Sequence, residues 1–122
     1  MKPIDPPWTT LVDVATLAAA LGEGVRVVDA RATASTAVRV VDARAALADP
    51  QAGAGQYAAG HIPGAVHADL NQDLSDLRRS GHGRHPLPDS DAFAARVGQW
   101  GIGPDTQVVV YDGSDGSMAA AR

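Results

Sequence analysis

The chain has 122 residues, of which 10 are Lys or Arg and 14 are Asp or Glu, so its formal net charge is −4. That length supports one compact domain and excludes two full domains. The acidic balance argues against a nucleic-acid partner, which needs clustered Lys and Arg. No apolar run approaches the ~18 residues that a membrane helix needs, and the opening MKPIDPPW lacks the apolar stretch of a signal peptide. We therefore expect a cytoplasmic protein that binds neither nucleic acid nor a membrane.

The chain contains no cysteine. This absence excludes disulfides, thiolate metal sites and every cysteine nucleophile within these residues. It limits the possible functions more than any residue that is present.

The first predicted element is a helix over residues 14–21. Asp13 is placed to cap it, and Gly22 follows as a stop signal. One face of this helix is predicted to carry Leu17, Ala18 and Leu21.

A seven-letter segment then occurs twice. Val-Arg-Val-Val-Asp-Ala-Arg stands at 25–31 and again, letter for letter, at 38–44. Two copies are too few for a solenoid. We place the second copy in a sheet, as a strand over 38–42, because it leads directly into the segments downstream. Residues 25–37 are then expected to be a duplicated insertion.

The rest of the chain alternates between strand and helix patterns. After a loop over 45–55 we expect a short buried strand at 65–66, leucines at helical spacing within 70–79, and a loop over 80–88. A helix capped by Asp89 or Ser90 follows to about residue 99. Then come a buried parallel strand over 107–111, a loop over 112–117 and the start of a helix at 118–122. Alternating strands and helices indicate an α/β fold with a short parallel sheet flanked by helices. Because the last helix is expected to cross back to a further strand, we expect the domain to be truncated at its C-terminus.

The loop after the last strand is the first candidate site. In parallel sheets, ligands bind at the carboxyl ends of the strands. A loop rich in Gly and Ser before a helix can also direct backbone N–H groups at an anion. Here the loop carries carboxylates at Asp112 and Asp115, which would repel an anionic substrate. We therefore interpret both mainly as turn-forming and capping residues.

Several segments together resemble a rhodanese (sulfurtransferase) domain. They are Val-Asp-Ala-Arg at 41–44, Tyr57 with Gly-His-Ile-Pro-Gly-Ala at 60–65, and Val-Val-Val-Tyr-Asp at 108–112 with its loop. Arg-His-Pro-Leu-Pro at 84–88 and Trp-Gly-Ile-Gly-Pro-Asp at 100–105 are similar, more narrowly, to the first domain of tandem thiosulfate/3-mercaptopyruvate sulfurtransferases. The resemblance implies a rhodanese-like fold for residues 1–122, as the N-terminal half of a longer tandem protein.

The resemblance also implies where the chemistry would be. In active family members the loop opens with a cysteine that carries sulfur as a persulfide, and here that position is Asp112. The remnant active-site loop is Asp112, Gly113, Ser114, Asp115, Gly116 and Ser117. A carboxylate cannot carry a persulfide, so the chain alone is expected to be inactive, with no functional catalytic residue of its own.

The partner that the resemblance implies is a C-terminal catalytic rhodanese domain of the same protein. In some tandem enzymes a histidine of a His-x-Leu-Pro segment faces the active loop of that second domain, and His85 matches it. At the position where the family has a nearby acidic residue, this chain has Asn71. Against this contribution to the second-domain site stands the interpretation of His85 as a surface loop histidine.

Other functions are less well supported. A stand-alone inactive rhodanese module that binds an anion or a partner protein is the alternative. Hydrolysis with Asp112 as the nucleophile lacks a positioned base or metal. His61, His67, His82 and His85 have no helical i, i+4 pairing that would indicate a metal site, and we read His61 as a turn residue whose ring bonds local backbone. Asp42 and Arg44 are predicted either to orient the loops as a pair or to form a surface ion pair. We expect no metal and no cofactor.

Overall fold

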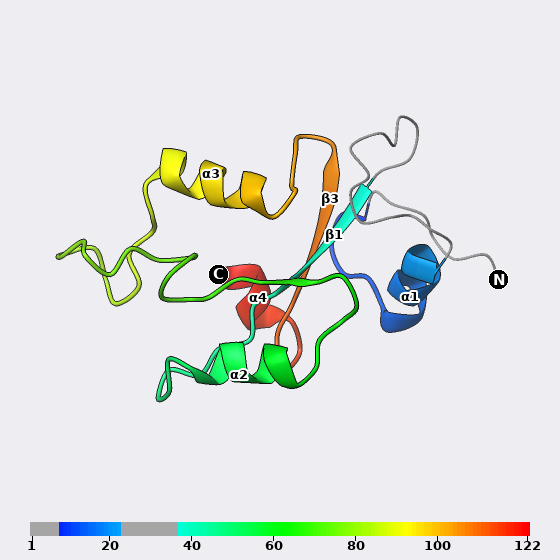
Figure 1. The fold of residues 1–122 in the computed structure, drawn as a ribbon, viewed down its shortest axis with the longest axis horizontal. Coiled ribbons are helices and arrows are strands. Elements are labelled where there is room, and N and C mark those ends of the chain that lie inside the picture. The colour runs from blue at the N-terminus through cyan, green and yellow to red at the C-terminus, as the bar shows by residue number, and fades with distance from the viewer. Residues whose placement is uncertain (1–7, 23–36) are drawn as a thin grey trace.

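A computed structural model describes residues 8–22 and 37–122 (Figure 1). In chain order the elements are α1 (Val14–Gly22), β1 (Ala37–Asp42), α2 (Ala52–Ala59), β2 (Val66–His67), α3 (Ser90–Gln99), β3 (Thr106–Tyr111) and α4 (Ser117–Ala121). The three strands are parallel, in the order β2-β1-β3. The predicted α/β fold with a short parallel sheet is therefore confirmed. The first copy of the repeat lies outside the described residues, as does the expected insertion except for Ala37, which begins β1.

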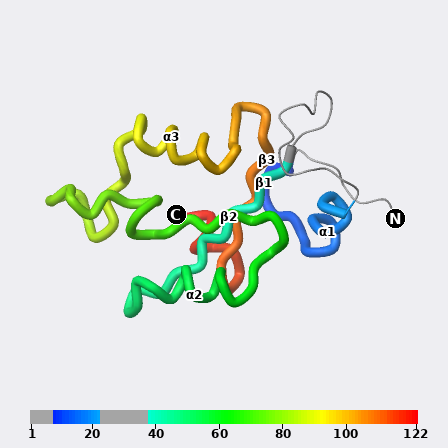
Figure 2. The backbone as a smooth tube through the Cα atoms, in the orientation of Figure 1, coloured from blue at the N-terminus to red at the C-terminus, as the bar shows by residue number. Residues whose placement is uncertain are grey.

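The second copy of the repeat forms the central strand. β1 pairs with β3 along its whole length, from Ala37↔Thr106 to Asp42↔Tyr111, and with β2 at Val41 and Asp42. Val38 and Val40 are fully buried. Val38 and Val40 lie on one face of the strand, and Val41 on the other face is 4% exposed, so both faces of β1 are covered around these residues. Figure 2 shows the three strands by their labels. Because Asp42 ends β1 and pairs with His67 of β2 and Tyr111 of β3, it lies at the centre of the sheet's carboxyl end.

Strand β3 was predicted to be buried, and this was wrong for one of its faces. Val109 and Tyr111 pack against the core, whereas Val108 and Val110 are each 38% exposed. Among the described residues β3 pairs only with β1, so it lies at an edge of the sheet. The apolar run alone does not distinguish an edge strand from a central one.

Helix α1 begins at Val14 as the sequence predicts and ends at Gly22, one residue beyond the predicted end. The Asp13 carboxylate accepts a hydrogen bond of 2.7 Å from the Thr16 N–H, as an N-cap does. Leu17 is buried and joins the core cluster. The buried face was predicted partly wrongly, because Ala20 is buried whereas Ala18 is exposed.

Helix α2 overlaps the predicted loop over 45–55, for which the sequence suggested no more than a helical turn, so that prediction was wrong for residues 52–55. The Ala- and Gly-rich sequence of α2 has little apolar contrast. Its approach to the end of β1 depends on Gly53, where a Cβ would stand 2.1 Å from the Arg44 carbonyl oxygen. A hydrogen at this position lets the helix pack directly against the backbone that follows β1.

The predicted helical spacing of leucines within 70–79 does not produce a helix. Instead, the Asp69 carboxylate accepts hydrogen bonds of 2.9 Å from the N–H groups of Asn71 and Gln72. Asp73 in turn accepts one of 2.8 Å from the Asp69 N–H. Aspartates that bind nearby backbone in this way compete with helix formation.

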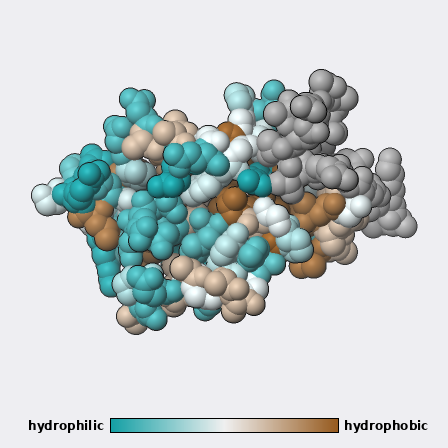
Figure 3. All heavy atoms as spheres, viewed as in Figure 1, coloured by the Kyte–Doolittle hydropathy of each residue, from teal (hydrophilic) through white to brown (hydrophobic). Residues whose placement is uncertain are grey.

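Helix α3 is capped by Asp89, whose carboxylate accepts from the Ala92 N–H, and it ends at Gln99 as predicted. It lies apart from the strands in Figure 1, and none of its described residues is buried. An ion pair of 3.1 Å between Arg96 and Asp73 ties it to the turn after β2. Hydrophilic residues cover much of the face shown in Figure 3. No helix in the described ranges is long and apolar enough to cross a membrane.

Candidate functional site

The loop after β3 closes around its own first residue. The Asp112 Oδ1 atom accepts hydrogen bonds from the N–H groups of Ser114 (2.8 Å) and Gly116 (3.1 Å), and its Oδ2 accepts from Ala119 (2.9 Å). Gly116, at φ 90°, supplies the left-handed turn that begins α4. The backbone donors that could have faced an anion therefore bind the carboxylate of Asp112.

This environment suits an ionised carboxylate. The N–H groups of Ala119 and Ser114 hold the pKa of Asp112 below its ordinary value. The Asp115 carboxylate accepts hydrogen bonds from the Ser117 hydroxyl (2.7 Å) and N–H (3.0 Å), which lower its pKa as well. Both contacts fit the turn-forming and capping roles predicted for these aspartates.

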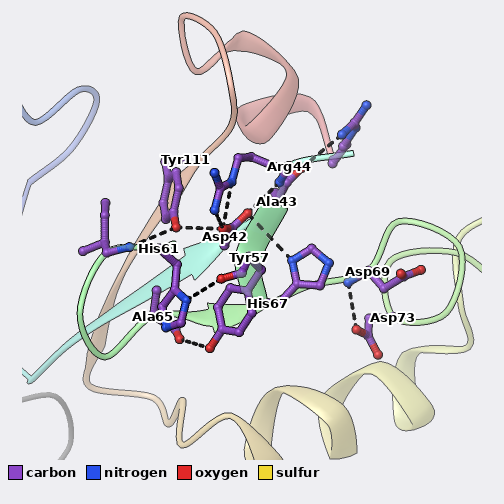
Figure 4. A network of polar contacts seen from close by, with 12 residues as sticks. Asp42, Ala43, Arg44, Tyr57, His61, Ala65, His67, Asp69, Asp73 and Tyr111 are labelled. Atoms are coloured by element: carbon purple, nitrogen blue, oxygen red, sulfur yellow. Dashed lines mark hydrogen bonds and ion pairs between the residues drawn. The ribbon is translucent and has the colours of Figure 1, made fainter. Parts of the chain in front are cut away.

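A polar network lies beside the loop, at the carboxyl ends of β1 and β3 (Figure 4). Its centre is Asp42, whose side chain is fully buried. Arg44 binds the Asp42 Oδ2 through Nε (3.0 Å) and Nη2 (2.7 Å), and its N–H binds Oδ1 (2.9 Å). The Tyr111 hydroxyl donates to the same Oδ2 at 2.7 Å. The structure thus favours an orienting pair over a simple surface ion pair at Asp42 and Arg44.

The donors around Asp42 keep it charged despite its burial. Burial by itself raises the pKa of this carboxyl, but the hydrogen bonds from Arg44 and Tyr111 and the Arg44 charge outweigh it and bring the pKa below the ordinary value. Burial and the bond to Asp42 raise the pKa of Tyr111. Asp42 is therefore an anion and Tyr111 a neutral donor at neutral pH.

The network extends to the Gly-His-Ile-Pro turn. Arg44 Nη2 donates to the Gly60 carbonyl oxygen at 2.6 Å, and the guanidinium carbon lies 5.6 Å from the centre of the Tyr111 ring. The Tyr111 hydroxyl accepts from the Ile62 N–H at 3.3 Å. Two strand ends and the turn after α2 are thus held by one buried carboxylate and its two partners.

Aromatic residues support the same turn. The ring of His61 stacks on Tyr57 with centroids 3.7 Å apart, and its Nδ1 lies 2.7 Å from the Tyr57 carbonyl oxygen. The predicted bond of His61 to local backbone is confirmed. The Tyr57 hydroxyl donates to the Ala65 carbonyl oxygen at 2.7 Å. His67 Nδ1 lies 3.7 Å from Asp42 Oδ1, and neither of its ring nitrogens has a hydrogen-bond partner among the described residues.

The structure brings His85 and Asn71 together, but not with the loop. Both line a small cavity of about 20 Å³ beside Arg44 and Asp69. Asp112 lines a different hollow, which Trp8 and Val110 share. Within the described residues no group of three His, Asp or Glu side chains is placed to hold a metal ion.

Sequence reasoning missed Tyr111 as a donor to Asp42 and Tyr57 as a support of the turn. The signal for Tyr111 was available in part. It closes a strand predicted to be parallel to β1, so its position at the strand end suggested proximity to Asp42, although not the register Asp42↔Tyr111.

Comparisons with known proteins support the resemblance. The family described as "Rhodanese-like domain" matches residues 13–122. A probable 3-mercaptopyruvate sulfurtransferase from Pseudomonas aeruginosa is 50% identical over 76 residues, which are 62% of this chain and 27% of that protein. The 3-mercaptopyruvate sulfurtransferase of Homo sapiens is 43% identical over 61 residues, 50% of this chain and 20% of that protein.

A solved structure shows the same fold. It is a 3-mercaptopyruvate sulfurtransferase from Leishmania major, which matches with a TM-score of 0.58 and 35% identity over 62% of this chain and 21% of that one. The matches thus span only 20–27% of the length of these relatives. The predicted rhodanese-like fold is confirmed, and the chain belongs to the rhodanese family.

Proposed function

We propose that this chain serves as the non-catalytic rhodanese-like domain of a thiosulfate/3-mercaptopyruvate sulfurtransferase. In this proposal a second domain carries the cysteine that holds sulfur as a persulfide. The chain packs on that domain and shapes its substrate cleft. The names of the relatives from Pseudomonas aeruginosa and Homo sapiens support the reaction class.

The contacts of Asp112 carry the proposal. Its carboxylate accepts the loop's N–H groups at 2.8–3.1 Å, at the position where active relatives are expected to hold a thiolate. A carboxylate cannot form a persulfide, and the chain has no cysteine elsewhere. This chain therefore cannot transfer sulfur through a persulfide of its own.

The same contacts argue against an anion-binding module. An incoming thiosulfate would have to displace Asp112 from its donors and then lie beside the charges of Asp112 and Asp115. Both carboxylates have lowered pKa values and are ionised at neutral pH. A structural role beside a catalytic domain needs no such displacement.

His85 is the residue of this chain that we propose to contribute to the second domain's site. It is partly exposed in the loop before Pro86. With Asn71 in place of the family's acidic residue, we expect His85 to act by contact with substrate rather than through a carboxylate relay.

The test joins this chain to the catalytic domain of the Pseudomonas aeruginosa relative and compares three proteins: the chain alone, the catalytic domain alone and the joined protein. With 3-mercaptopyruvate and a thiol acceptor, we expect no turnover by the chain alone and faster turnover by the joined protein than by the catalytic domain alone. His85→Ala should lower the joined protein's rate, and the matched control His82→Ala, on the same exposed loop, should not. Turnover by the chain alone, or equal rates with and without it, would contradict the proposal.

A further inference from the structure

The letters that fill the central strand position occur twice in the chain. The copy at 38–44 forms most of β1 and the turn out of it, and the copy at 25–31 has the same letters. The identity continues for one further residue, because Ala32 and Ala45 follow the two copies. The same side chains are therefore available to the β1 position from two places in the chain.

The contacts that hold β1 in the sheet are made by the repeated letters. Arg39 Nη1 donates to the Gly64 carbonyl oxygen at 3.3 Å, and Arg44 Nη2 donates to the Gly60 carbonyl oxygen at 2.6 Å. The fully buried side chains of the strand also lie within the repeat: Val38, Val40 and Asp42. The first copy has an identical side chain for each of these contacts.

Two arrangements of the chain can therefore place the same side chains in the sheet. We name them by the copy that forms the strand: the 38–44 register, which the structure describes, and the 25–31 register. The copies start 13 residues apart, at 25 and 38. In the 38–44 register these extra residues lie between α1 and the strand, and in the 25–31 register they lie between the strand and α2.

The connections of the strand allow both registers. Leu21, near the end of α1, packs against the cluster that contains Val38 and Val40, so the 25–31 register requires only a short connection from α1 to the strand. Doubling the length of a loop lowers an equilibrium constant only about threefold. Moving thirteen residues from one connection to the other therefore changes the balance little, whereas the side-chain contacts stay the same.

We infer that the two copies compete for the β1 position and that the chain exchanges between the two registers. The exchange moves thirteen residues from the amino end of the central strand to its carboxyl end, where the loop over 112–117 begins. It changes the surface beside the candidate site without changing the core. This inference goes beyond the proposed function and concerns the strand position alone, so sulfur transfer by the joined protein does not bear on it.

The first test is thermal melting of asparagine variants. Asp42 accepts from Arg44 and Tyr111 in the 38–44 register, and Asp29 takes its place in the 25–31 register. A 25–31 register that holds about a tenth of the folded chains limits the loss in Asp42→Asn to about tenfold in the folding equilibrium constant, a fall in Tm of about 5 °C. Asp29→Asn alone should leave Tm unchanged within about 1 °C. Added to Asp42→Asn, it should lower Tm by at least a further 5 °C or so, because neither copy then supplies the carboxylate.

The matched control adds Asp105→Asn to Asp42→Asn. It removes the same charge at an exposed position outside both copies and should cause no further loss. In a chain with one register, Asp29→Asn would have the same small effect with and without Asp42→Asn, and that result would overturn the inference. Equal further losses from Asp29→Asn and Asp105→Asn would overturn it as well.

A second measurement detects the 25–31 register directly and does not depend on the stability of the asparagine variants. Arg39 lies opposite Val108 in the pairing of β1 with β3. Neighbouring strands lie about 4.7–4.9 Å apart, within the range of Cα separations that a disulfide can bridge. Because the chain has no cysteine, Arg26→Cys combined with Val108→Cys can form one disulfide within the chain, and the 25–31 register brings its two positions together.

The oxidation is carried out with oxidised glutathione, and the products are mapped by mass spectrometry on the monomer. We expect the disulfide between positions 26 and 108 to accumulate with time. Arg39→Cys with Val108→Cys is the positive control for the 38–44 register, and Thr33→Cys with Val108→Cys, between the two copies, is the control for random encounter. A 26–108 disulfide that is absent while the 39–108 disulfide forms, that is no more frequent than the 33–108 disulfide, or that joins only separate chains would overturn the inference.

Discussion

The hydroxyl of Tyr111 should contribute more to stability than that of Tyr57, although both donate at 2.7 Å. The acceptor for Tyr111 is the buried, ionised carboxylate of Asp42, whereas the acceptor for Tyr57 is a neutral backbone carbonyl. Hydrogen bonds to charged groups contribute about 1.5–3 kcal/mol, and neutral ones about 0.5–1.5 kcal/mol. Replacement of each tyrosine by phenylalanine removes one oxygen and leaves the ring, so the pair of variants compares the two acceptors directly.

The expected difference is large enough to measure. Unfolding entropy of about 2.1 cal/mol/K per residue gives about 0.26 kcal/mol/K for a chain of this length, so 2 kcal/mol corresponds to a fall in Tm of about 8 °C. We expect about 6–12 °C for Tyr111→Phe and about 2–6 °C for Tyr57→Phe at pH 7, measured by circular dichroism under identical buffer conditions.

Acidification provides a second, independent check. The pKa of Asp42 is lowered in the folded protein, so its contribution to stability is fully present above its ordinary pKa of 3.8 and is lost as the pH falls through the folded value. Without the Tyr111 hydroxyl the pKa of Asp42 in the folded protein is less depressed, so less stability is lost on acidification. The gap in Tm between wild type and Tyr111→Phe should therefore narrow below pH 3.8, while the Tyr57→Phe gap should not. Equal losses for both variants at pH 7, or a Tyr111→Phe gap that stays constant on acidification, would refute the assignment of Asp42 as a buried anion.

Three further outcomes are expected. Gly53→Ala should destabilise the protein by at least about 1–3 kcal/mol, because its Cβ would meet the Arg44 carbonyl oxygen at 2.1 Å. Gly55→Ala in the same helix has open space and should stabilise the protein by about 0.5–1 kcal/mol. Urea unfolding that ranks the two variants in the opposite order would contradict the packing at Gly53. Asp112→Asn should lower the melting temperature at pH 7 and make the melting temperature less dependent on pH below 3.8, because the pKa of Asp112 is lowered in the folded protein and its contribution to stability is lost on acidification. A pH profile of the melting temperature that is unchanged in the variant would show that the N–H contacts of Asp112 do not favour its charged form. Deletion of residues 25–37 should leave a cooperative thermal transition, because Val38–Asp42 keep their register with β3 and Gly24 again precedes Val-Arg-Val-Val; a protein without such a transition would show that the first copy is needed.

What could be predicted from the sequence was local. Asp13 and Asp89 each precede a helix whose third N–H they bind, so a few adjacent letters were sufficient. The run Gln107–Tyr111 indicated a parallel strand because β-branched residues favour extended backbone.

What could not be predicted depends on distant residues. The exposure of Val108 and Val110 depends on which strands lie beside β3, and the helix over Ala52–Ala59 depends on a fit between Gly53 and the Arg44 carbonyl. In the candidate site, the pairing of Asp42 with Arg44 could be suspected from their spacing. The Tyr111 bond required knowledge of the register between two strands far apart in the chain.

Strand β1 is synthesised well before β3, the strand with which it pairs along its whole length. The Tyr111–Asp42 bond joins positions 69 residues apart, so the carboxylate of Asp42 is made long before its second donor. At about 5–20 residues per second, β1 waits about 3–14 s for the end of its neighbour to be added. During that interval Val38 and Val40, which are fully buried in the finished fold, have no β3 to pair with. Until β3 is complete, the apolar side chains of β1 are therefore available for mispairing.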